Sequence, residues 1–114
     1  MNYPCCLIIN THPRYEVGEH LLALFINQYG YGYFFDSFGF HPRFYGQDTY
    51  IDKITLGYEW NKNRIQGLSA LCGYYCLLYL LFRVRNRQNY FFNSFTKNYK
   101  KNDLKLIEMI NKYE

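Results

Sequence analysis

The feature that most limits the fold is the apolar run over 68–82, which follows the polar start "RIQG". It carries Cys72 and Cys76, which lie one helical turn apart. The run is too short to span a bilayer, which takes about 20 residues. Apolar residues lie on nearly every side of a helix drawn through it, as they do in helices at the centre of a core. We therefore expect a buried central helix over 70–86, with Ser69 as its N-cap.

Four short segments around this helix predict β-strands, because they are rich in β-branched and aromatic residues or alternate between apolar and polar ones. They span residues 5–10, 20–27, 33–39 and 58–65. Gly30 and Gly32 suit a hairpin turn, so the second and third segments should pair antiparallel. Residues 41–47 are typical of a loop, and residues 48–56 are ambiguous between a loop and a short helix.

Two more helical patterns follow the central helix. One covers 89–98, and the other begins at a cap formed by Asn102 or Asp103 and carries an apolar stripe. The stripe consists of Leu104, Ile107 and Ile110. A chain of 114 residues corresponds to one domain, and no repeat or low-complexity linker divides it. We expect a single α+β domain over 1–114, in which a small antiparallel or mixed sheet packs on the buried helix.

The cysteines and charges exclude several classes of protein. The four cysteines do not form a disulfide framework, since two are adjacent and two lie in the apolar run. No His or Cys pair has zinc-ligand spacing, so we expect no metal and no cofactor. The N-terminus has no signal peptide, and reduced thiols are typical of intracellular proteins. The net charge of +4 comes mainly from 82–90 and 97–105, which favour solvated helix faces, with nucleic-acid contact as the alternative.

Three polar residues interrupt the apolar segments in an order that suits nucleophilic catalysis. His20 opens one strand, and Asp36 lies among aromatic residues in the next, where a buried charge needs a partner. Antiparallel neighbours can place these two side by side, which would orient the imidazole. Cys72 lies in the first turn of the central helix, where the helix dipole and free N–H groups favour a thiolate. A histidine beside that thiol would make a Cys–His nucleophile pair.

Two further residues complete the candidate site. Gln66, in the loop that enters the central helix, could direct its amide at a developing oxyanion, together with the backbone N–H of Cys72. Gly73 would let a substrate approach the nucleophile closely, because it has no side chain.

The remaining cysteines and histidines are more often structural than catalytic. A cysteine within an apolar helix usually packs as a small hydrophobic residue, which is our interpretation of Cys76. We interpret Cys5 and Cys6 in the same way. His12 and His41 each stand directly before a proline and are typical of loops.

The same segments resemble a known family. The stretches "GEHLLALFIN", "YFFDSFGF" and "RIQGLSALCGYYCLLYLLFR", with the lead-in "CCLIINTHPRYEVGEH", together resemble the adenoviral-type cysteine proteases. They are still more similar to the related proteases of Maverick/Polinton virus-like elements. The ubiquitin-like-protein proteases share the same fold and order of motifs. The resemblance covers about residues 4–86 and implies the adenain type of the papain-like cysteine protease superfamily.

The resemblance implies a role for each site residue. His20 would be the general base and Asp36 the acid that orients it. Gln66 would donate to the oxyanion, and Cys72 would be the nucleophile of a cysteine endopeptidase. The implied substrates are viral or virus-like precursor proteins, cut near small residues such as Gly. Leu21 stands where the family usually carries Trp, a residue that helps to shape the site around the His–acid pair. The N-terminus is shorter than in the family, so we expect a domain truncated there.

Partners and location also follow from the resemblance. The adenoviral enzymes are activated by a viral peptide and by DNA, so an activating peptide and DNA stimulation through the basic segments are candidates here. We expect a monomer without membrane association, in the host cytoplasm or nucleus or associated with the virion. Two alternatives stay open: a protease for ubiquitin-like modifiers, and a catalytically inactive domain of the same fold that binds protein or nucleic acid.

Overall fold

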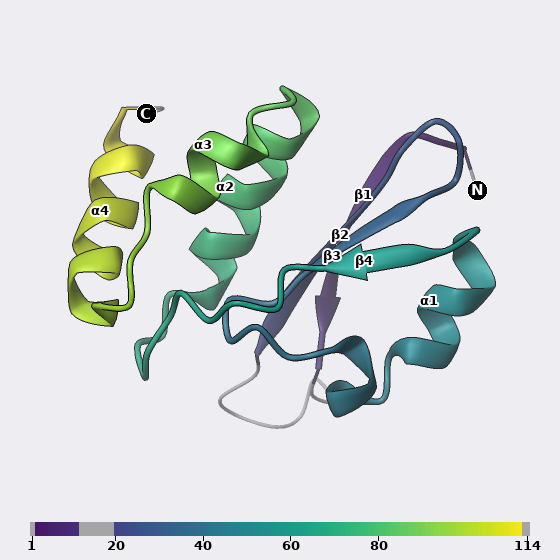
Figure 1. Ribbon diagram of the computed structural model, residues 1–114, viewed down its shortest axis with the longest axis horizontal. Helices are drawn as coiled ribbons and strands as arrows, with labels where there is room; N and C mark the ends of the chain where they lie inside the picture. The colour runs from purple at the N-terminus through teal and green to yellow at the C-terminus, as the bar shows by residue number, and fades with distance from the viewer. Residues whose placement is uncertain (1, 12–19, 113–114) are drawn as a thin grey trace.

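The computed structural model describes residues 2–11 and 20–112, and it contains a mixed four-stranded sheet with helices around it (Figure 1). The strands lie in chain order and are β1 (Cys5–Asn10), β2 (Leu21–Ile26), β3 (Gly32–Phe35) and β4 (Tyr58–Trp60). The β1–β2 and β2–β3 pairs are antiparallel, and the β3–β4 pair is parallel. The α+β class and the antiparallel pairing of the second and third strands are therefore confirmed.

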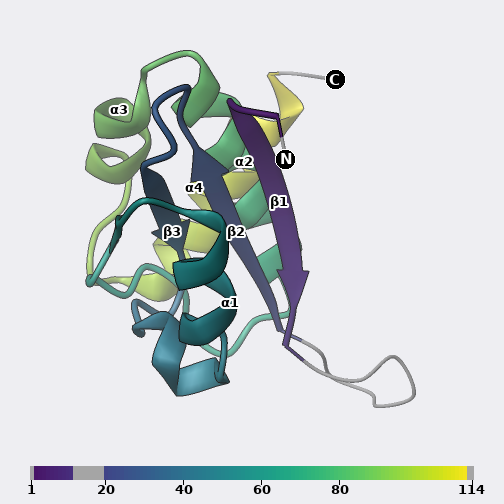
Figure 2. The same ribbon diagram turned by 90° about the vertical axis from the view of Figure 1, so that its right-hand side faces the viewer.

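Helices cover both faces of the sheet. They are α1 (Asp48–Ile54), α2 (Cys72–Val84), α3 (Gln88–Asn93) and α4 (Tyr99–Asn111). Figure 2 shows β1, β2 and β3 side by side, with α1 in front of them and α2 and α4 behind. The ambiguous segment 48–56 is thus mainly helical, and it packs on the opposite face from the central helix α2.

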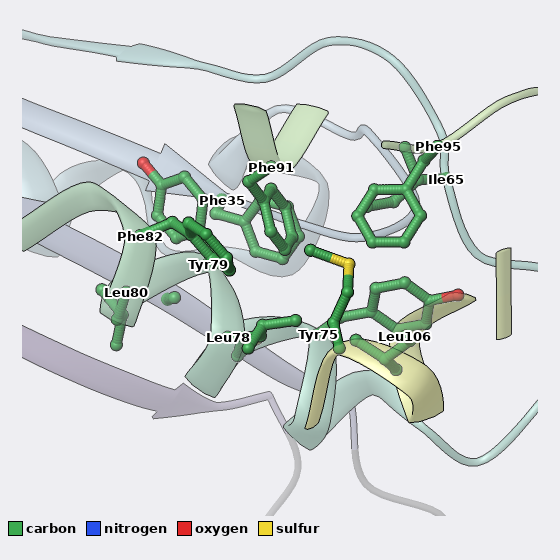
Figure 3. Packing of buried hydrophobic residues seen from close by; sticks show 13 residues of the cluster. Phe35, Ile65, Tyr75, Leu78, Tyr79, Leu80, Phe82, Phe91, Phe95 and Leu106 are labelled. Atoms are coloured by element: carbon green, nitrogen blue, oxygen red, sulfur yellow. The ribbon is translucent and has the colours of Figure 1, made fainter. Parts of the chain in front are cut away.

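Strand β2 separates two hydrophobic clusters, because successive side chains of a strand point to opposite faces. On one face, Leu22 and Leu24 pack with Ile51 of α1. On the other, Ala23 joins the larger cluster formed with the helices. There Tyr79 stacks on Phe35 at a centroid distance of 4.5 Å, with Phe91 edge-on to both rings (Figure 3). The predicted central position of the apolar helix is therefore confirmed for the inner face of α2, which is the face that packs in this cluster.

The outer face and the start of α2 differ from the prediction. The helix begins at Cys72 instead of residue 70, and its N-cap is Leu71, which makes no side-chain capping bond. The prediction of Ser69 as the cap was wrong, because this residue accepts hydrogen bonds from Gln66 instead. Nor is the helix buried all round, since some of its apolar residues remain on the surface. Tyr74 and Leu77 are 54% and 59% exposed.

Strands β3 and β4 end several residues earlier than predicted, and a turn explains where β3 stops. β3 stops at Phe35 because the chain turns at Asp36, whose carbonyl accepts the N–H of Gly39 at 2.8 Å. Gly39 has φ +79°, and a Cβ there would lie 2.8 Å from the backbone of Lys62 and Asn63, so only glycine fits. β4 ends at Trp60 instead of residue 65.

The predicted loop over 41–47 contains a single turn of 3-10 helix, Pro42–Tyr45, instead of being irregular throughout. His41 caps it by accepting the N–H of Arg43 at its Nδ1 atom, 3.1 Å away. Gly46, in the left-handed conformation, ends it. This short turn matters for the site because it places Tyr45.

The C-terminal helices also differ from the prediction. The helix expected over 89–98 is α3, which ends at Asn93. Helix α4 is capped by Asn98, whose side chain accepts the N–H of Lys101 at 3.2 Å, and not by Asn102 or Asp103.

The predicted stripe of α4 was also wrong, because its first two residues face away from the core. Leu104 and Ile107 are 69% and 45% exposed. The buried face is formed by Asn102, Leu106 and Met109. Asn102 can be buried because its amide makes three hydrogen bonds, to Ile65 and to both backbone groups of Thr96.

Within the two described stretches of the chain, none of the helices combines the length and the apolarity that a membrane span would require.

Candidate active site

The predicted pair of His20 and Asp36 is present at one end of the sheet. His20 immediately precedes β2 and Asp36 immediately follows β3, and these two strands are antiparallel neighbours. The Nε2 atom of His20 lies 2.6 Å from Oδ1 of Asp36. Asp36 is completely buried, and His20 is 9% exposed. The structure thus supplies the partner that a buried carboxylate in this aromatic segment requires.

Asp36 is held by donors from its own loop. The N–H of Phe38 donates to Oδ1 and the N–H of Phe40 donates to Oδ2, each over 3.1 Å. The hydroxyl of Tyr45 donates to Oδ2 over 2.5 Å. Asn61 fixes the backbone at the same point, since its side chain bonds both the N–H and the carbonyl of Asp36. Four donors, counting His20, therefore satisfy a carboxylate from which water is excluded.

Aromatic rings hold the imidazole of His20 in one orientation. Phe38 stacks on it with centroids 4.4 Å apart and planes 9° apart, and Tyr45 lies at 5.6 Å. Arg64 covers the Phe38 ring, with its guanidinium carbon 4.9 Å from the centroid. The same arginine donates from Nε to the carbonyl of Gln66 at 2.6 Å. Arg64 therefore connects the ring that orients His20 to the segment that leads into α2.

Cys72, the first residue of α2, shares a side-chain hydrogen bond with the ring of His20. Because Nε2 of the ring is bonded to Asp36, Nδ1 is the nitrogen that faces the sulfur. The sulfur also accepts backbone hydrogen bonds from Leu21 and Gly73. The structure thus brings His20, Asp36 and Cys72 together as a chain of contacts through the imidazole.

These contacts change the pKa of both groups that face each other. The hydrogen bond from His20 lowers the pKa of Cys72 below its ordinary value of 9.0, and although burial opposes this, the Leu21 and Gly73 N–H groups add to it. For His20, burial lowers the pKa, but the hydrogen bonds and charges of Asp36 and Cys72 outweigh burial and raise it to about 9. Both shifts act in the same direction, because they favour a thiolate on Cys72 facing an imidazolium on His20.

Gln66 lies in the loop that leads into α2, but its side chain makes other hydrogen bonds than the predicted oxyanion role requires. It is completely buried, and its Nε2 donates to the carbonyl and the hydroxyl of Ser69, at 2.8 and 3.2 Å. Its Oε1 accepts from the hydroxyl of Ser37. Its amide is therefore bonded within the loop, and donation to an oxyanion would require it to leave Ser69. The backbone N–H of Cys72, at the first position of the helix, has no intrahelical acceptor.

A hollow of about 410 Å³ opens beside the thiol. Its lining consists of Leu21, Ala70, Cys72, Gly73, Tyr74 and Leu77. Gly73 lies in this lining next to Cys72, where the prediction placed the close approach of a substrate. A Cβ on Gly73 would lie 3.1 Å from Cδ1 of Leu21, so a larger residue would crowd that side chain.

The other cysteines and histidines lie apart from these contacts. Cys76 is completely buried, donates from its sulfur to the carbonyl of Leu21 at 3.2 Å, and has a pKa that burial raises far above its ordinary value. Its predicted role as a core residue is confirmed. Cys6 is an exposed residue overall. Its pKa is raised, mainly because its thiol is partly buried and also because of the neighbouring Cys5.

The other two histidines also lie apart from the site contacts or outside the described residues. His41 packs edge-on against Trp60, and His12 falls outside the described residues. Among the described residues, no three His, Cys, Asp or Glu side chains are placed to hold a metal ion.

Three residues of the site were missed by the sequence analysis: Tyr45, Asn61 and Arg64. A signal for Tyr45 existed, because the proline and glycine that flank "PRFYG" are typical of a single helical turn. Asn61 and Arg64 carried no such signal. Their contacts depend on how the loop after β4 packs against the loop after β3, which no local pattern describes.

No family model and no curated protein matches the sequence.

Proposed function

We propose that the chain is a cysteine endopeptidase of the papain-like superfamily, of the adenain type that its motifs resemble. The observation that carries the proposal is the imidazole of His20, which contacts the buried carboxylate of Asp36 at one nitrogen and the thiol of Cys72 at the other. A nucleophile, a base and a group that orients the base are the parts that acyl transfer through a thiol requires.

The reaction follows from the protonation states of the pair. The Cys72 thiolate attacks the peptide carbonyl carbon and forms a carbon–sulfur bond, and the carbonyl electrons move to the oxygen. When the tetrahedral intermediate collapses, the carbon–nitrogen bond breaks and the imidazolium of His20 gives its proton to the leaving amine. A water molecule then attacks the thioester while His20 takes its proton, which releases the acid and restores the thiolate. Asp36 orients the ring during both steps and stabilises the imidazolium whenever His20 is protonated.

The negative charge on the carbonyl oxygen needs hydrogen-bond donors. The N–H of Cys72 is one, because it stands at the helix start without an intrahelical acceptor. The amide of Gln66 is the second donor in this proposal, and it becomes available when it exchanges Ser69 for the oxyanion. Proteolytic maturation of viral or virus-like precursors near small residues rests on the resemblance alone.

The proposal is tested by cleavage of a degenerate peptide library, with new termini identified by mass spectrometry. We expect cleavage by the wild-type chain and none by Cys72→Ala. Cys6→Ala is the matched control, because its thiol is exposed and outside the site, and this variant should cleave like the wild type. Equal cleavage by Cys72→Ala and the wild type would contradict the proposal.

A second candidate function is a binding domain of the same fold without turnover. One observation favours it: the amide of Gln66 is bonded to Ser69 in a completely buried position. A thiol at Cys72 that reacts rapidly with iodoacetamide, in a protein that cleaves no library peptide, would favour this candidate.

A further inference from the structure

The hollow beside the thiol has a lining of unusual composition for a surface. Besides Cys72 and Gly73, four largely apolar residues form it: Leu21, Ala70, Tyr74 and Leu77. Apart from the sulfur of Cys72, none of these described lining residues carries a charged side chain. Its volume of about 410 Å³ is within the range of sites that bind small ligands, which are mostly apolar as well.

Two residues of this lining, Tyr74 and Leu77, are not required by the core. The inner face of α2 is buried against the sheet and the other helices, whereas Tyr74 and Leu77 remain 54% and 59% exposed on its outer face. They follow Gly73 by one and four residues, so the three share one side of the helix next to the thiol. Apolar side chains that stay in water beside a reactive group favour a role in binding.

The position of the hollow identifies what it binds. Cys72 itself belongs to the lining, so a peptide whose carbonyl carbon lies at the sulfur must run along or across the hollow. Residues of an extended peptide are about 3.3 Å apart, so a side chain next to the scissile bond reaches the surface formed by Gly73 and Leu77. The absence of a side chain at Gly73 keeps that surface open.

We propose that this hollow is a specificity subsite for an apolar side chain of the substrate, on a residue flanking the scissile bond. The inference rests on the proposed peptidase function and deepens it by naming a substrate class. Leu21, Tyr74 and Leu77 are the residues that select the side chain, and none of them takes part in the chemistry. Acidic or amide side chains at the same substrate position are disfavoured, because the lining is mainly apolar and contains no basic or amide side chain to pair with them.

The test measures kcat/KM for peptides that differ at one position at a time on either side of the cleaved bond. At one flanking position, we expect Leu or Phe to exceed Asp or Asn by about ten-fold or more. In Leu77→Ser, this ratio should fall toward one. The matched control is Val84→Ser on the same helix, since Val84 is 52% exposed and outside the hollow, and its ratio should stay at the wild-type value.

The outcomes separate this inference from the function on which it rests. Cleavage with no apolar preference at any flanking position would overturn the subsite and leave the peptidase proposal standing. A preference that survives unchanged in Leu77→Ser would also overturn it. Absence of cleavage of every peptide, with a folded protein, would overturn the proposed function and the subsite together.

Discussion

The Nε2 atom of His20 lies 2.6 Å from Oδ1 of Asp36, a carboxylate that is completely buried and held by three further donors. These two residues are 16 positions apart in the sequence, and the antiparallel pairing of β2 with β3 brings them together. The carboxylate leaves the other ring nitrogen of His20 to face Cys72. Every prediction about reactivity depends on this contact.

The pH dependence of kcat/KM should be bell-shaped if His20 and Cys72 act as proposed. The thiolate form of Cys72 is required, and its pKa is lowered, so activity should fall as the pH drops through that lowered value. The imidazolium of His20 is required to protonate the leaving amine, so activity should also fall as the pH rises past about 9. Steady-state rates measured over roughly pH 4–11 would record both limbs.

Asp36→Asn should move the alkaline limb of that profile to lower pH. The carboxylate raises the pKa of His20, so without its charge the imidazolium loses its proton at a lower pH, nearer to 6.5. Asp52→Asn is the surface control, because Asp52 is exposed on α1, and its profile should match the wild type. An alkaline limb that stays near 9 in Asp36→Asn would contradict the assigned contact.

Tyr45→Phe should lower the free energy of unfolding by about 1 kcal/mol, because it removes a neutral donor from the buried carboxylate of Asp36. Urea denaturation measures this change. Tyr50→Phe is the matched control, since Tyr50 is 44% exposed, and its stability should change by less than about 0.5 kcal/mol. Equal stability of Tyr45→Phe and the wild type would mean that this hydrogen bond contributes nothing measurable.

The difference between the expected and observed roles of Asn102 shows what sequence reasoning can and cannot predict. His20, Asp36 and Cys72 could be predicted because each is a polar or reactive residue placed within or beside an apolar segment. Asn102 was expected at a helix end, because asparagine at a cap and asparagine in a core look alike in sequence. Its burial depends on hydrogen bonds to Ile65 and Thr96. Ile65 is 37 positions away in the sequence, and both residues lie in loops, so no local pattern indicates these bonds.

The exposed leucines were mispredicted for a related reason. A pattern of apolar residues shows which side of a helix is apolar, but not whether another element covers it. Leu104 of α4 and Leu77 of α2 both look like core residues in sequence, and both are mainly exposed. What covers a helix depends on the packing of the whole chain, and some apolar residues serve binding instead of the core.

Asn102→Ala should destabilise the protein by about 3 kcal/mol, because it leaves the buried carbonyl of Ile65 and the part-buried N–H and carbonyl of Thr96 without this partner. Asn111→Ala is the control, because Asn111 is exposed near the end of the same helix. Its free energy of unfolding should change by less than about 0.5 kcal/mol. Urea denaturation of both variants tests the difference. A loss in Asn102→Ala as small as that of the control would contradict the buried network.

Gln66→Ala should lower kcat by about 10²–10³-fold if its amide reaches the oxyanion during catalysis. Alkylation of Cys72 by iodoacetamide involves no oxyanion, so its rate should stay near the wild-type value. The urea denaturation curve shows whether the variant is folded, since Gln66 also accepts a bond from Ser37. An equal fall of alkylation and turnover would show a structural role for Gln66, and an unchanged kcat would exclude the oxyanion role.

The central claim is that His20 keeps Cys72 as a reactive thiolate, and the pH dependence of its alkylation tests this most directly. The rate of iodoacetamide modification at Cys72 is followed by peptide mass spectrometry in the wild type and in His20→Ala. Cys6, whose pKa is raised, serves as the internal control. In the wild type, Cys72 should react at neutral pH faster than Cys6, with a midpoint below 9.0. In His20→Ala, that midpoint should rise toward 9.0 or above. Equal rates for Cys72 and Cys6, or a midpoint that His20→Ala leaves unchanged, would contradict the account.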